Sequence, residues 1–277
     1  MLASNLHMTS MMKDLKSTVL TIVAISISMS ATLVRAANTV TLYEGSYSYS
    51  VGGEFTAITS QNYLGYYSSS AENTETVSGK SVTGFQTFCV ETGVPFTPQK
   101  SYTYTTGLST APDSGAAGSG LALSIGAAYL YYEFGTGNLT GYNYNNTATS
   151  KTVPYSRLTD AGLLQAAIWY FQGGQTYSGF YGSKGNPAIT SDPFYLLAIS
   201  ALGSLANAMS AYTGTSVEIL QLWNGTTPAQ AQLVLTGNTA PKAPPGKPVP
   251  DGGMTVVLLG VVLVGMFMIK SWQRKFV

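Results

Sequence analysis

Residues 160–171 have the sequence Asp-Ala-Gly-Leu-Leu-Gln-Ala-Ala-Ile-Trp-Tyr-Phe, and this stretch decides the fold class. Its alanines and leucines favour a helix, Thr159 or Asp160 can cap its N-terminus, and Gly173-Gly174 can end it. Comparable patterns predict two further helices, at residues 121–134 and from about 191 to 212. The middle of the chain is therefore expected to be helical.

Alternating apolar and polar residues on both sides of this helical part predict β-strands. The expected strands are residues 39–43, 46–51, 54–58, 82–90, 217–223 and 231–235. Residues 59–81 and 136–156 have the composition of loops. The prediction is an α+β fold, with strand-rich N- and C-terminal parts packed with a central group of about three helices.

The composition of residues 38–240, the expected folded domain, excludes several kinds of function. Five basic and ten acidic side chains give this span a net charge of −5, so nucleic acid is not expected as a partner. The chain has one histidine, His7, which precedes this span, and one cysteine, Cys89. Ser-His or Cys-His catalysis, the common zinc sites and an internal disulfide are therefore excluded, and we expect no cofactor.

The N-terminal 36 residues have the order of a signal peptide. A charged patch at 13–16 precedes an apolar run at 19–34, and Val34-Arg35-Ala36 supplies a plausible cleavage site after Ala36. Cleavage after Ala37 is the second choice, and a retained membrane anchor is the alternative to a signal peptide. We therefore expect the protein to be exported.

The C-terminal 37 residues form a tripartite tail. A proline-rich spacer at 241–248 is followed by the motif Val249-Pro250-Asp251-Gly252-Gly253, an apolar helix at 254–269 and a basic cap at 270–277. Sixteen residues rise only about 24 Å as a helix, which makes 254–269 a short membrane span.

This tail resembles the PEP-CTERM class of sorting signals, and its motif looks most like the VPDSG-type variant, with Gly252 where that variant has serine. The resemblance implies recognition by an exosortase at the inner membrane of a Gram-negative bacterium. The protein would be held transiently by 254–269 and would then reach the cell surface or the extracellular matrix. An ordinary single-pass anchor is the alternative.

Two short blocks, Phe88-Cys89-Val90 and Leu164-Gln165-Ala166-Ala167-Ile168-Trp169, resemble the signature segments of the thioester domains of surface adhesins. The resemblance implies a thioester-domain-like fold in which Cys89 Sγ is bonded to Gln165 Cδ. Phe88, Val90, Ala166, Ile168 and Trp169 would form the environment of that bond. Leu164 departs from the family, which has threonine before the glutamine.

A thioester requires these residue types because a thiolate is a nucleophile soft enough to displace ammonia from a carboxamide. The acyl group then captures an amine of another protein or surface ligand once, without turnover, so the protein is not expected to be an enzyme. The alternative is a non-covalent structural component of the extracellular polysaccharide matrix, with Cys89 inert in the core and Gln165 merely exposed.

Two other groups have open roles. Glu91 suits either a general base or a solvated loop acid, and the second interpretation is favoured. The tyrosines of 129–132 and 142–155 suit either a platform for polysaccharide or the core face of a helix, and for Tyr129, Tyr131 and Tyr132 the core is favoured. The acidic residues are too scattered for a glycan hydrolase.

Overall fold

The computed structural model of the protein describes residues 37–49, 52–112, 120–145, 156–173 and 189–242. The expected signal peptide with its cleavage site at Ala36 lies outside these described residues, as do the sorting motif 249–253, the helix 254–269 and the basic cap. Those features remain predictions from the sequence.

Within the described ranges, seven strands form one antiparallel sheet in the order β3-β4-β2-β1-β5-β6-β7. The strands are β1 Thr39–Tyr49, β2 Gly52–Thr59, β3 Glu72–Val77, β4 Lys80–Thr87, β5 Ser101–Gly107, β6 Val217–Asn224 and β7 Thr227–Leu235. Because β5 pairs with both β1 and β6, it joins the N-terminal and C-terminal strands into a single sheet.

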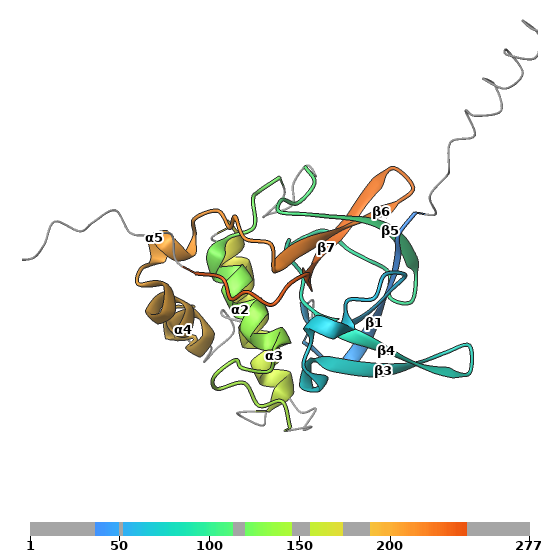
Figure 1. The fold of residues 1–277 in the computed structure, drawn as a ribbon, viewed down its shortest axis with the longest axis horizontal. Coiled ribbons are helices and arrows are strands. Elements are labelled where there is room, and N and C mark those ends of the chain that lie inside the picture. The colour runs from blue at the N-terminus through green and yellow to red at the C-terminus, as the bar shows by residue number, and fades with distance from the viewer. Residues whose placement is uncertain (1–36, 50–51, 113–119, 146–155, 174–188, 243–277) are drawn as a thin grey trace, which may run out of the picture. The chain divides into compact units, whose positions relative to one another are not determined.

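Four α-helices lie in the described part of the chain: α2 Ile125–Gly135, α3 Arg157–Gly173, α4 Pro193–Leu202 and α5 Leu205–Ala208. Three 3-10 helices cover Leu64–Tyr66, Ser69–Ala71 and Ile189–Ser191. Figure 1 shows the helices gathered on one side of the sheet. The α+β prediction is confirmed: a strand-rich N-terminal part and a strand-rich C-terminal part enclose a helical middle.

Several predicted boundaries were wrong. Helix α3 starts before the expected caps Thr159 and Asp160, because Ser156 Oγ accepts a hydrogen bond from Thr159 N at 3.2 Å. The expected third helix is two helices, since Gly203 takes φ 80° and ends α4. Strand β3 lies in the expected loop 59–81, and it pairs with β4 along its whole length.

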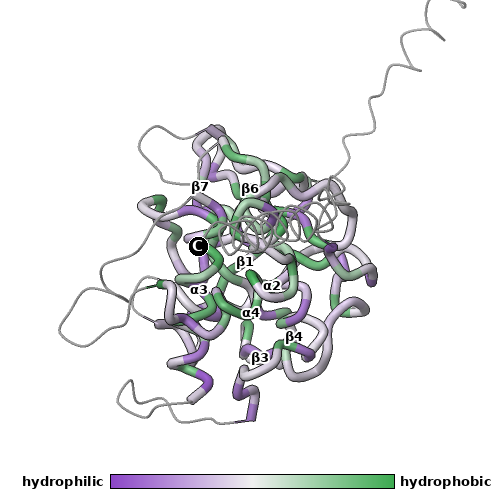
Figure 2. Tube along the Cα trace, turned by 90° about the vertical axis from the view of Figure 1, so that its left-hand side faces the viewer, coloured by the Kyte–Doolittle hydropathy of each residue, from purple (hydrophilic) through white to green (hydrophobic). Residues whose placement is uncertain are grey.

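The helices pack on the sheet through α3, which contacts β1 and β2, and α2, which contacts β6 and β7. Hydrophobic residues lie mainly along the central helices and strands, and hydrophilic segments lie toward the outside (Figure 2). Tyr131 is completely buried and Tyr132 is 9% exposed, which confirms the core interpretation of these two tyrosines. No helix in the described ranges has both the length and the apolar character to cross a membrane.

We expect Gly126→Ala to destabilise the protein, because Gly126 is where α2 approaches α3. A Cβ atom there would lie 2.7 Å from Phe171 Cγ and 3.0 Å from the carbonyl oxygen of Ala208. The overpacked core should lower the free energy of unfolding in urea by about 1–3 kcal/mol, whereas the same change on an open helix raises it by about 1 kcal/mol.

Gly65→Ala is the matched control, because no atom lies within 4 Å of the added Cβ. It should change the free energy of unfolding by less than about 0.5 kcal/mol. A Gly126→Ala protein as stable as the wild type would contradict the close packing of α2 and α3.

Candidate functional site

Cys89 lies just beyond the end of β4, where the chain pairs briefly with β7. Val90 N donates to Ala231 O at 3.0 Å and Leu233 N donates to Phe88 O at 3.1 Å. Cys89 therefore lies opposite Gln232 in an antiparallel bridge. Because the flanking residues make the backbone hydrogen bonds to β7, the N–H and C=O of Cys89 itself point away from β7. These two backbone groups are buried and need partners from another element.

Gln165 of α3 supplies both partners. Cys89 N donates to Gln165 Oε1 at 3.0 Å, and Gln165 Nε2 donates to Cys89 O at 2.8 Å. The side-chain carboxamide thus takes the place that the backbone of a neighbouring strand would occupy. Both residues are completely buried, so the interpretation of Gln165 as an exposed helix residue is wrong.

The surroundings of Cys89 are apolar and closed. Phe55, Ala166 and Trp169 pack with Cys89 in a small cluster, and the partly buried Tyr49 and Phe96 lie against it. The rings of Phe55 and Phe96 meet edge to face with centroids 4.9 Å apart. Water is therefore largely excluded from the sulfur and the carboxamide.

The backbone of β2 closes the site over Gln165. A Cβ atom on Gly52 would lie 2.6 Å from Gln165 Cγ and 3.0 Å from Trp169 Cη2. Glycine is required at this position because any side chain would push Gln165 away from Cys89.

The predicted environment residues divide between two clusters. Ala166 and Trp169 contact the cluster that contains Cys89. Phe88, Val90 and Ile168 are completely buried, but they belong to the main core, and Leu164 lies there as well. Leu164, which stands where the thioester-domain family has threonine, therefore contributes an apolar side chain to the main core.

Burial is the main cause that raises the pKa of the Cys89 thiol to about 12. The hydrogen bond from Gln232 opposes this rise, and the nearby carboxylate of Glu91 adds a smaller contribution to it. Glu91 is only 2% exposed, and its Oε2 accepts from Ala231 N at 3.2 Å. The favoured interpretation of Glu91 as a solvated loop acid is therefore wrong.

Sequence reasoning missed Gln232. It is completely buried, and its Nε2 donates to Cys89 Sγ at 3.4 Å. The sequence did contain a signal for it, since Gln232 is the one amide in the otherwise apolar run 231–235. A polar side chain in such a buried strand is expected to have a hydrogen-bond partner inside the protein.

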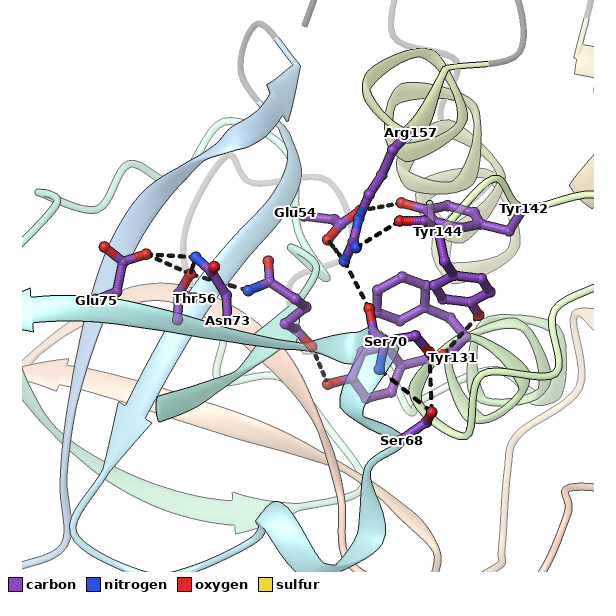
Figure 3. A network of polar contacts seen from close by, with 12 residues as sticks. Glu54, Thr56, Ser68, Ser70, Asn73, Glu75, Tyr131, Tyr142, Tyr144 and Arg157 are labelled. Atoms are coloured by element: carbon purple, nitrogen blue, oxygen red, sulfur yellow. Dashed lines mark hydrogen bonds and ion pairs between the residues drawn. The ribbon is translucent and has the colours of Figure 1, made fainter. Parts of the chain in front are cut away.

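A buried polar network fixes α3 relative to β2. Arg157 Nε donates to Glu54 Oε1 at 2.8 Å and Arg157 Nη2 donates to Glu54 Oε2 at 2.7 Å, while Tyr142 Oη donates to Glu54 Oε1 (Figure 3). The guanidinium also lies 4.7 Å from the ring centre of Tyr47 on β1. Burial raises the pKa of the Glu54 carboxyl, and the bonds from Arg157 and Tyr142 oppose that effect.

The ion pair of Glu54 and Arg157 helps to position the site because it joins β2 to α3, the strand and the helix that hold Gly52 and Gln165. Glu54 lies two residues after Gly52 on β2, and Arg157 lies two turns before Gln165 on α3. The pair therefore fixes the helix against the strand close to the point where Gln165 meets Cys89.

No family model, no curated protein and no solved structure matches this chain. The described residues contain no group of three or more His, Cys, Asp or Glu side chains placed to hold a metal ion. The site is therefore interpreted from its own geometry.

We expect Arg157→Met to destabilise the protein by about 3–5 kcal/mol, because it leaves the Glu54 carboxylate buried without its cation. The double variant Glu54→Gln, Arg157→Met should recover much of this loss, since the neutral amide still accepts from Tyr142. Urea unfolding monitored by tryptophan fluorescence measures both values. Equal losses in the single and double variants would contradict a strong ion pair.

Proposed function

We propose that this protein is an exported bacterial surface or matrix protein in which Cys89 and Gln165 form an internal thioester that captures an amine. The observation that carries the proposal is the contact between the Gln165 carboxamide and the backbone of Cys89, within a closed apolar cluster. The chain's only cysteine and this glutamine are 76 residues apart in the sequence, yet they are buried together.

In the proposed thioester formation, sulfur replaces nitrogen on the side-chain carbonyl carbon of Gln165. Cys89 Sγ attacks Gln165 Cδ, the bond from sulfur to carbon forms, and the bond from Cδ to Nε2 breaks. The thiol proton leaves with the amide nitrogen as ammonia. Cys89 N–H already donates to Gln165 Oε1, so it can stabilise the negative charge that develops on this oxygen during the attack.

Amine capture is the second step. A primary amine attacks Gln165 Cδ, a new amide bond forms, and Cys89 leaves as a free thiol. The apolar cluster of Phe55, Ala166 and Trp169 slows the competing hydrolysis by limiting access of water. Each molecule reacts once, so this is covalent attachment of an adhesin or crosslinker and not enzymatic turnover. No cofactor takes part.

Export and sorting complete the proposal and rest on the two ends of the chain. The signal peptide ending at Ala36 would direct secretion. The motif 249–253 and helix 254–269 would be handled by an exosortase in the inner membrane, and the spacer 241–248 would hold the folded domain outside it. The captured partner would be an amine-bearing protein or surface ligand in a polysaccharide-rich layer.

A non-covalent structural role is the second candidate, and two observations favour it. Both polar ends of the Gln165 carboxamide already have hydrogen-bond partners, and burial raises the pKa of Cys89 to about 12. In this case Gln165 would replace a missing strand beside Cys89, and the thiol would remain protonated and inert at neutral pH. The two candidates predict different masses.

The thioester predicts an intact mass about 17 Da below that of the unmodified chain, because ammonia has left. Methylamine should then add about 31 Da to the thioester form and release one thiol for alkylation. Electrospray mass spectrometry of the purified chain, before and after methylamine, measures both changes.

Cys89→Ala and Gln165→Ala are the matched controls, and each should have its full calculated mass and no reaction with methylamine. The wild-type chain at full mass, with a Cys89 that is alkylated only after unfolding, would reject the thioester and support the structural role.

A further inference from the structure

Gln232 has a buried side-chain amide in which the nitrogen makes a hydrogen bond and the oxygen makes none among the described residues. Its Nε2 donates to Cys89 Sγ at 3.4 Å, and its side chain is completely buried on β7. No described residue donates a hydrogen bond to its Oε1. A buried carbonyl oxygen without a donor is costly, so its presence beside the only thiol of the chain requires an explanation.

The position of Gln232 follows from the sheet. It is the residue opposite Cys89 in the bridge between the segment after β4 and β7. The backbone bonds flank this pair, so it is of the type in which opposed side chains approach most closely. The amide of Gln232 therefore faces the sulfur from the side of β7, while Gln165 meets the same residue from the side of α3.

From this geometry we infer that Gln232 is a catalytic residue of the site, with one end acting on the sulfur and the other on the nitrogen. Its Nε2 stabilises the sulfur as negative charge develops there, and its Oε1 accepts a hydrogen bond from the N–H of the amine. The inference deepens the proposed thioester function and rests on it.

The same contacts serve both steps, because aminolysis of the thioester is the reverse of its formation with a different amine. In formation, Gln232 Oε1 receives the departing ammonia. In capture, it receives the attacking primary amine, while Cys89 departs as a thiolate that Gln232 Nε2 stabilises and that then takes up the proton released by the amine. The substrate class is therefore an amine that carries at least one N–H, as every primary amine does, because Oε1 accepts from that N–H as the nitrogen attacks Gln165 Cδ.

The chain provides a matched control for the loss of a buried glutamine. Gln230 is 5% exposed on the same strand, but its Nε2 donates to the carbonyl oxygen of Glu91 at 3.0 Å and not to the sulfur. Gln230→Leu and Gln232→Leu each remove one buried amide and one hydrogen bond from β7. They differ in whether that bond reaches Cys89.

The test compares the wild-type, Gln232→Leu and Gln230→Leu chains at full length, with methylamine as the probe. Intact mass gives the fraction that has lost about 17 Da, and the time course gives the rates of gain of about 31 Da by aminolysis and about 18 Da by hydrolysis. We expect Gln232→Leu to form less thioester or to react with methylamine at least about tenfold more slowly. Any thioester that does form should give a lower ratio of amide to acid product.

Gln230→Leu should retain the wild-type mass loss, rate and product ratio, with a similar melting temperature. If Gln232→Leu does not fold, Gln232→Met replaces it, since that variant retains the approximate size but has neither the N–H donor at the sulfur nor Oε1. Wild-type rate and product ratio in the Gln232 variant overturn the inference, as does an equal loss in Gln230→Leu. A wild-type chain without the mass loss instead rejects the thioester itself.

Discussion

The structure depends on the two hydrogen bonds between the Gln165 carboxamide and the backbone of Cys89. Cys89 pairs with β7 on one side only, so its N–H and C=O would otherwise be buried without partners. Gln165 satisfies both groups and in doing so places its Cδ beside the chain's only cysteine. The same side chain thus satisfies the backbone of Cys89 and carries the carboxamide on which the proposed acyl transfer depends.

The remaining contacts hold α3 where Gln165 can reach Cys89. The buried pair of Arg157 and Glu54 ties the start of α3 to β2, and Gly52 lets the same strand approach Gln165 closely. Such a pair contributes little net stability relative to an apolar pair, but it penalises any displacement that separates its charges. Its value here is positional, because a small shift of α3 would separate the amide from the cysteine.

Closure of the site has opposing chemical effects. Exclusion of water protects a thioester from hydrolysis, yet the same burial raises the pKa of the Cys89 thiol and disfavours the thiolate that must form the bond. Gln232 is the contact that opposes this penalty, since its Nε2 donates to the sulfur. The proposed chemistry therefore requires polar groups on two sides of Cys89, Gln165 from α3 and Gln232 from β7, inside an apolar cluster.

By itself, the sequence determined the α+β class, most of the elements, the absence of histidine and disulfide chemistry from the folded domain, and the pairing of Cys89 with Gln165 as a hypothesis. These features depend on local periodicity, on composition and on short motifs. Only the tertiary structure decided that β3 is a strand, that Glu91 is buried, and that Gln232 and the pair of Glu54 and Arg157 belong to the site. The physical reason is that these roles arise from contacts between segments far apart in the chain. The role of a buried polar residue depends on the group that it contacts, and local sequence patterns do not specify that group.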